Sequence, residues 1–202
     1  MSAIIETNTL RGRNLEFLTI GWNLVEAFVS LVAGLVAGSV SLIGFGIDSL
    51  IECGSATVLL WRLQDGERGE AREKFALKLV GFSFLFLAAY VAFGAVKSLI
   101  AVERPEISFA GIVIAVLSLI VMPILARMKR QVAENIKSRA LKADARQTSI
   151  CAYLSAILLV GLVLNALFGW WWADPVAALI MTPIIVKEGL EALRGETCDD
   201  CH

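Results

Sequence analysis

The uninterrupted apolar stretch ISFAGIVIAVLSLIVMPILA, residues 107–126, decides the fold class. It contains no charged side chain, and about 20 apolar residues are what an α-helix needs to cross the hydrocarbon core of a bilayer. Similar stretches lie on both sides of it. Hydrophobic residues make up 57% of the 202-residue chain, against about 45–50% in ordinary soluble domains. Because this apolar excess has to lie in lipid, we predict an all-α membrane protein.

The hydropathy pattern predicts a bundle of six transmembrane helices joined by short loops. It divides the chain into a cytoplasmic N-terminal segment (1–14), a six-helix transmembrane domain (15–193) and a short cytoplasmic tail (194–202). The sixth span is the weakest, and it is retained because Lys187 can snorkel and because it makes the number of spans even. The predicted spans are Leu15–Val36, Val40–Trp61, Phe75–Leu99, Ile107–Ala126, Lys142–Phe168 and Asp174–Leu193.

The basic residues determine the predicted orientation. If both termini are cytoplasmic, all of the 18 Lys and Arg residues except Lys97 and Arg104 lie on the cytoplasmic side, as the positive-inside rule requires. The longest loop, residues 127–141, is basic and is expected to continue its flanking helices into the cytoplasm. The polar first 14 residues show no cleavable signal peptide. We therefore expect a multi-pass protein of the cell (inner) membrane.

Two carboxylates in the middle of the second span are the first candidate site. Asp48 and Glu52 are four residues apart, so they share one helix face, and Ser55 extends that face. A charged side chain near the bilayer centre costs about 2.5–3.5 kcal/mol or more and marks a candidate functional site. Two carboxylates at this spacing repel each other unless a divalent cation or a shared proton lies between them.

The fifth and first spans carry further polar stripes. In the fifth span the polar residues recur at helical spacing; they are Asp144, Gln147, Cys151 and Ser155. The first span has a milder stripe that includes Asn23 and Glu26. We predict that these three spans face a common polar cavity. The third, fourth and sixth spans are much less polar and are expected to face lipid or a partner.

The donor types in these stripes favour a transition metal as substrate. A thiolate from Cys151 and two carboxylates, completed by Gln147, Asp144 or water, suit a zinc-like cation better than Mg²⁺ or Ca²⁺. The structural alternative is a carboxylate pair neutralised by a buried base, but neither span holds Lys or Arg at matching depth. Cys151 alone is more often a small buried hydrophobic residue. Glu26 either lines the cavity or is a hydrogen-bonded packing residue.

The tail ends in Cys198-Asp-Asp-Cys-His202, with Cys198, Cys201 and His202 as possible ligands for a soft metal. The same pattern is a signature of c-type haem attachment, but a cytoplasmic tail without an apolar pocket speaks against that reading. A neutral, disordered end is the simplest alternative. A further hypothesis is that the protein is a membrane thiol oxidoreductase that uses Cys198 and Cys201.

The two strongest stripes resemble the motifs of the cation diffusion facilitator family of metal/proton antiporters. The segment from Ser39 to Glu52 resembles the (His/Asp)-x-x-x-Asp motif of the second span, with Asp48 and Glu52 on the ligand positions. The segment from Ala140 to Cys151 resembles the Ala-Asp-x-x-His-x-x-x-Asp motif of the fifth span. Here Gln147 stands at the histidine position and Cys151 at the second aspartate position.

The resemblance implies a six-helix bundle that exports a divalent metal from the cytoplasm by proton antiport, without the family's C-terminal cytoplasmic domain. It implies a homodimer, which we place on the phenylalanine-rich third span (Phe82, Phe84, Phe86). The partners are then metal ions, protons and the bilayer, with no organic cofactor and no enzymatic activity. The near balance of 18 basic against 19 acidic residues excludes a basic nucleic-acid binder. The alternative is a metal-binding or regulatory membrane protein without transport.

Overall fold

The computed structural model describes residues 2–65, 70–136 and 139–194, and these form six α-helices. They confirm the predicted all-α class, and no strand occurs within the described ranges. The helices are α1 (Ser2–Ala37), α2 (Val40–Asp65), α3 (Glu70–Ala101), α4 (Phe109–Ile136), α5 (Arg139–Phe168) and α6 (Ala173–Arg194).

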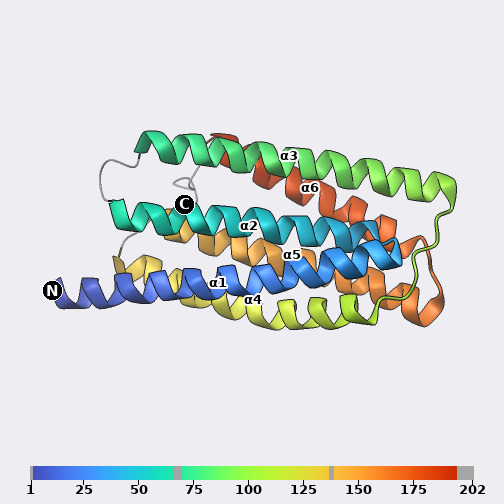
Figure 1. The fold of residues 1–202 in the computed structure, drawn as a ribbon, viewed down its shortest axis with the longest axis horizontal. Helices are drawn as coiled ribbons and strands as arrows, with labels where there is room; N and C mark the ends of the chain where they lie inside the picture. Colours follow the sequence, from blue (N-terminus) through green and yellow to red (C-terminus); the bar gives the residue numbers. More distant parts are fainter. Residues whose placement is uncertain (1, 66–69, 137–138, 195–202) are drawn as a thin grey trace.

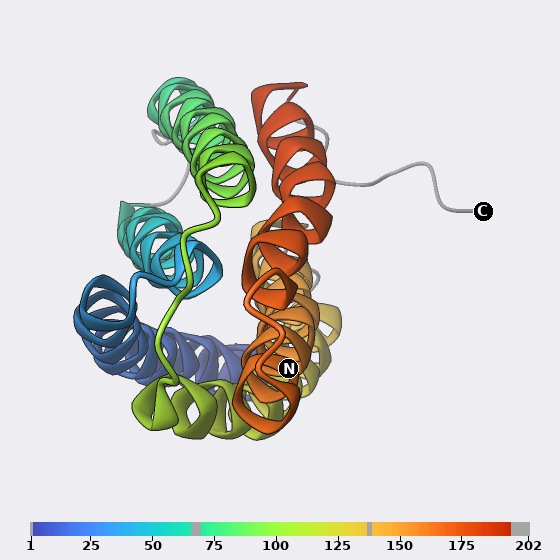
Figure 2. The same cartoon turned by 90° about the vertical axis from the view of Figure 1, so that its right-hand side faces the viewer.

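The helices run antiparallel to their chain neighbours and close into one bundle. Contacts connect α1 to α2, α2 to α3, α3 to α6, α6 to α5, α5 to α4 and α4 back to α1. Helix α2 also crosses the middle of the bundle to reach α5 and α6. Figure 1 shows that α1 begins and α6 ends at the same end of the bundle, and Figure 2 shows α3 and α6 side by side, away from α1 and α4.

Five of the helices are long and apolar enough to cross a membrane, so the chain is a multi-pass membrane protein. Helix α6 falls outside that group because charged residues occupy its second half. It nevertheless has 22 residues, about 33 Å at 1.5 Å per residue, and it packs along α3 as a member of the bundle. The loop predicted at 127–141 is largely helical, because α4 runs to Ile136 and α5 starts at Arg139.

Small residues allow close helix contacts at the positions where the backbones approach most closely. A Cβ at Gly81 of α3 would lie 2.8 Å from the carbonyl oxygen of Gly189 in α6. A Cβ at Gly34 of α1 would lie 2.9 Å from the backbone nitrogen of Ile43 in α2. In membrane bundles, where lipid is as apolar as the side chains, such close packing is a principal source of helix association.

The fourth and sixth spans were expected to face lipid or a partner, but α4 and α6 also turn polar residues into the bundle interior. Helix α4 buries Lys129 and Ser118, and α6 buries Asp174, so both helices supply polar groups to the interior. Of the phenylalanines assigned to a dimer contact, Phe82 and Phe86 are exposed but Phe84 is buried and faces the bundle core. Phe84 therefore packs inside the protomer.

Candidate metal centre

A narrow cavity lies where α2, α3, α5 and α6 meet, and it gathers four of the five predicted metal ligands. Its volume is about 10 Å³, room for about one water-sized sphere. It is lined by Asp48, Glu52, Phe84, Gln147, Ile150, Cys151, Leu154, Ile185 and Glu188. The structure thus places the two α2 carboxylates and the α5 thiol and amide around one small space.

The α2 side of the cavity presents Asp48 and Glu52 one helical turn apart, and both side chains are buried. One oxygen of Glu52, Oε1, accepts a hydrogen bond of 2.8 Å from the hydroxyl of Thr148. The other, Oε2, has no hydrogen-bond partner among the described residues. Because a buried carboxylate oxygen without a donor is costly, this oxygen is available for a cation or a proton.

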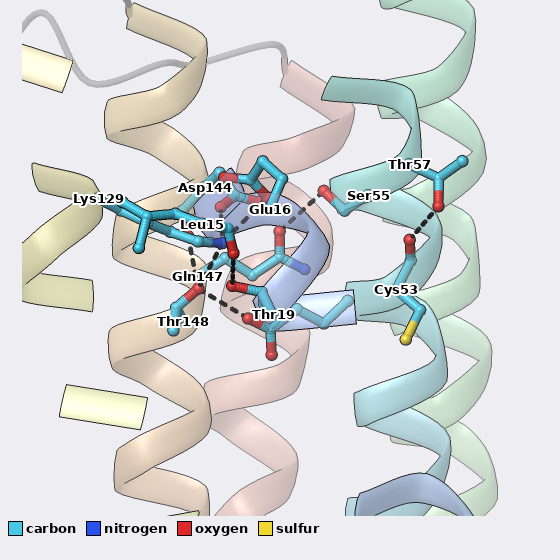
Figure 3. Close-up of polar contacts among 11 residues, drawn as sticks. Leu15, Glu16, Thr19, Cys53, Ser55, Thr57, Lys129, Asp144, Gln147 and Thr148 are labelled. Atoms are coloured by element: carbon cyan, nitrogen blue, oxygen red, sulfur yellow. Dashed lines mark hydrogen bonds and ion pairs between the residues drawn. The ribbon is translucent and has the colours of Figure 1, made fainter. Parts of the chain in front are cut away.

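The α5 side presents Gln147 and Cys151, again one turn apart. The Oε1 atom of Gln147 accepts a hydrogen bond of 3.0 Å from Ser55 of α2, so the predicted cavity residue Ser55 orients the amide (Figure 3). Its Nε2 atom has no partner in the described part of the chain. Cys151 is buried, and its Sγ lies 3.8 Å from Oε2 of Glu26.

The α1 residues lie beside the cavity and do not line it. Glu26 accepts hydrogen bonds from Ser49 at 2.7 Å and from the Trp22 indole at 3.2 Å, which favours the packing interpretation of this acid over the cavity-lining one. Asn23 is buried, and neither of its amide atoms has a partner within the described ranges.

Ser155 of α5 does not line the cavity either. It donates to the carbonyl of Cys151 in its own helix and pairs with Ser118 of α4.

Asp144, the fifth candidate ligand, points elsewhere. It forms a buried ion pair with Lys129, which also bonds Glu16 of α1 at 3.1 Å (Figure 3). Neither polar span holds a base at matching depth, but α4 supplies one. Lys129 was expected in the cytoplasmic loop, whereas α4 extends beyond it and buries its side chain. Asp144 therefore pairs with a neighbouring base, and Asp144 does not line the cavity.

The sequence did not identify two charged residues in or next to the site, Glu188 and Lys129. Glu188 on α6 lines the cavity, although its helix was expected to face away from the site. Lys129 continues the buried stripe of α4, which recurs every three or four residues through Met122, Leu125 and Ala126. That periodicity was a usable signal, and Glu188 likewise lies three residues after the buried Ile185 of α6.

The predicted ligands are near one another without forming a closed metal cage. In the described part of the chain, no group of three or more His, Cys, Asp or Glu side chains stands close enough to hold a metal ion as placed. A bound ion therefore requires the side chains to close around it. The possible tail ligands Cys198, Cys201 and His202 lie outside the described residues.

A further buried acid, Asp174, lies in the first turn of α6. Asp174 accepts hydrogen bonds from Ser39 at 2.5 Å, from the backbone N–H of Val40 at 3.0 Å and from Ser41. These donors start α2, so the carboxylate satisfies an otherwise orphaned helix N-terminus. The contact ties the beginnings of α2 and α6 together.

A bundle of membrane-spanning helices with a small cavity lined by carboxylates and a thiol defines an integral membrane protein. The family model described as the cation efflux transmembrane domain matches residues 17–196. The chain belongs to the cation efflux family.

Relatives in this family agree with the assignment. An uncharacterized transporter of Methanocaldococcus jannaschii is 27% identical over 84% of this chain and 63% of its own length. A cadmium, cobalt and zinc/H(+)-K(+) antiporter of Bacillus velezensis is 23% identical over 93% of this chain and 63% of its own length. A manganese efflux system protein of Bacillus subtilis is 24% identical over 91% and 66%. The chain spans about three-fifths of the length of the curated relatives it matches.

Proposed function

We propose that this chain carries a zinc-like divalent transition metal out of the cytoplasm in exchange for protons. The observation that supports it is the cavity itself, where Asp48, Glu52 and Cys151 meet inside the membrane part of the bundle. Carboxylate and thiolate donors together suit a borderline cation such as Zn²⁺. Relatives named for cadmium, cobalt, zinc and manganese support the substrate class.

Proton exchange follows from the chemistry of these donors. Neighbouring carboxylates in a low-dielectric cavity are costly as a charged pair, so each is stabilised by either a proton or a metal ion. A metal that binds through such groups displaces their protons. A cavity that opens to the cytoplasm with metal and to the other side with protons would therefore couple the two fluxes.

Three groups are candidates for the fourth position of the proposed coordination. Gln147 is a neutral amide and a weaker ligand than a histidine, so the fourth position is contributed by Gln147, Glu188 or water. Glu188 lines the same cavity from α6 and adds a carboxylate that the family's motifs in the second and fifth spans do not supply. Asp144 is not included, because Lys129 already pairs with it.

The test is metal flux into proteoliposomes that contain the full chain, read with a zinc-sensitive dye and with or without an imposed pH gradient. We expect gradient-dependent flux in the unmodified protein and its loss in Glu52→Gln. The matched control is Glu103→Gln, the same chemical change at a half-exposed acid that pairs with Lys97 on the surface. Undiminished flux in Glu52→Gln and in Asp48→Asn would remove the proposed site.

One observation favours the alternative of a metal-binding protein without transport: Gln147 stands where the family motif has histidine. Equilibrium zinc binding, measured beside flux on the same preparation, separates the two functions. Saturable binding that disappears in Glu52→Gln, together with no flux under any gradient, would establish the binding function.

A further inference from the structure

A buried charge cluster lies next to the cavity, toward the end of the bundle where α4 connects to α5. The Lys129 ammonium is fully buried and contacts Oε2 of Glu16 at 3.1 Å, a carboxylate oxygen of Asp144, and the hydroxyl of Thr148 at 3.4 Å (Figure 3). The cluster therefore joins α1, α4 and α5. Neither Lys129 nor Thr148 lines the cavity.

Thr148 connects this cluster to the cavity. Its hydroxyl donates to Oε1 of Glu52 at 2.8 Å, while the longer alternative, the carbonyl of Asp144 in its own helix, is 3.2 Å away. A bond to a carboxylate is stronger than one to a carbonyl, and the Lys129 ammonium donates to the same hydroxyl oxygen from the other side. The hydroxyl proton is thereby directed to Glu52.

The consequence for Glu52 is a fixed orientation. One of its oxygens is held by Thr148, and the other has no partner among the described residues. A glutamate side chain in a cavity has several rotamers, and a hydrogen bond to one carboxylate oxygen excludes most of them. The free oxygen is then positioned before the cation arrives, which lowers the entropic cost of binding.

We propose that Lys129 is a positioning residue for the cation centre, acting on Glu52 through the hydroxyl of Thr148. The proposal rests on the proposed metal binding at the cavity and adds to it a group that never touches the ion. It also explains why a membrane bundle keeps a buried lysine beside its centre, since a buried ion pair is weak evidence for stability but can fix one geometry.

The decisive variant is Thr148→Val, which removes the bridging hydroxyl at nearly constant volume. The full chain in detergent is titrated with Zn²⁺ against a competing fluorescent chelator. We expect the affinity to fall about tenfold, the lower end for a hydrogen bond to a charged group. Thr148→Ser, which keeps the hydroxyl, should restore it. The matched control is Thr182→Val, because that hydroxyl donates to the Ala178 carbonyl of its own helix.

The dependence on Lys129 is tested in a background in which the cluster is neutral. Lys129→Met alone leaves two buried carboxylates without their base, so Glu16→Gln and Asp144→Asn are added to keep the fold. In this triple variant, Thr148→Val should lower zinc affinity by about twofold or less. A full tenfold loss there would show that Thr148 acts without Lys129 and would overturn the proposal.

The outcomes separate this proposal from the proposed function. If the unmodified chain binds Zn²⁺ and Thr148→Val binds it equally tightly, the positioning role is wrong and the metal centre stands. If the unmodified chain binds no Zn²⁺, both fail. If the triple variant does not fold, the dependence on Lys129 is tested in Lys129→Met with Asp144→Asn, where a full tenfold loss on adding Thr148→Val would likewise overturn the proposal. In the unmodified background, equal losses in Thr148→Val and Thr182→Val would contradict the role of the Thr148 hydroxyl.

Discussion

Replacing Lys129 with methionine should destabilise the bundle more than any other single loss of a lysine charge in the described part of the chain. The side chains of Lys129 and Glu16 are fully buried, and that of Asp144 is 4% exposed. Removing one partner from a buried ion pair costs about 3–5 kcal/mol, because the remaining charge stays desolvated. Here two carboxylates lose the same partner, so we expect about 5 kcal/mol.

The matched comparison is Lys97→Met, the same substitution in a surface pair. Lys97 lies 3.1 Å from Glu103, with exposed fractions of 62% and 49%, and such pairs contribute about 0–1 kcal/mol after solvent screening. The free energy of unfolding is measured in mixed micelles from tryptophan fluorescence, which the five tryptophans of the chain allow. A difference below about 1 kcal/mol between the two variants would refute the reasoning.

A second substitution tests the cause of the loss. If the cost arises from uncompensated carboxylates, then adding Glu16→Gln to Lys129→Met should recover part of the stability, since one carboxylate fewer remains without a base. In the presence of Lys129, Glu16→Gln alone should destabilise the protein. Equal destabilisation by Glu16→Gln in both backgrounds would show that the two residues act independently.

Three further outcomes follow from the structure. Asp174→Ala should lower stability by about 2–4 kcal/mol, because its three donors lose a common acceptor; thermal unfolding in detergent measures this. Gly81→Ala should cost about 1–3 kcal/mol, because the new Cβ would lie 2.8 Å from the carbonyl of Gly189, whereas Gly54→Ala, with open space around it, should cost nothing measurable. Gln147→His should tighten zinc binding about tenfold in a chelator competition, and an unchanged affinity would exclude position 147 from the centre.

Helical periodicity predicted four of the residues that line the cavity, but five others that it placed there do not line it: Asn23, Glu26, Ser55, Asp144 and Ser155. Asp48 and Glu52, like Gln147 and Cys151, are four residues apart, and a long transmembrane helix keeps such pairs on one face whatever it packs against. Hydropathy predicted the six helices for a similar reason, because a span is a property of one continuous segment. The ends were less well predicted, since α1 and α4 continue as helices beyond their apolar cores.

The residues that sequence reasoning missed depend on contacts between helices. Glu16 lies three residues before Thr19 on the buried stripe of α1, and Lys129 continues the buried stripe of α4. The pattern of each helix places the residue on a buried face but does not identify the groups that it contacts. Only the packing of α1 and α5 against α4 brings Glu16 and Asp144 to the same ammonium group.

The cavity therefore lies at a boundary between two parts of the bundle that are held together differently. The Lys129 cluster ties α1, α4 and α5 to each other and, through Thr148, to Glu52 of α2. Helices α3 and α6 instead meet at glycine contacts, and α6 is tied to α2 by Asp174 at the opposite end. Glu188 comes from this second part, and the 2.8 Å ion pair between Arg146 of α5 and Glu191 of α6 helps to fix its distance from the α5 donors. Helical periodicity places Glu188 three residues after Ile185 on the buried stripe of α6. Which donors this stripe meets depends on contacts between helices, and a pattern within one helix does not reveal those contacts.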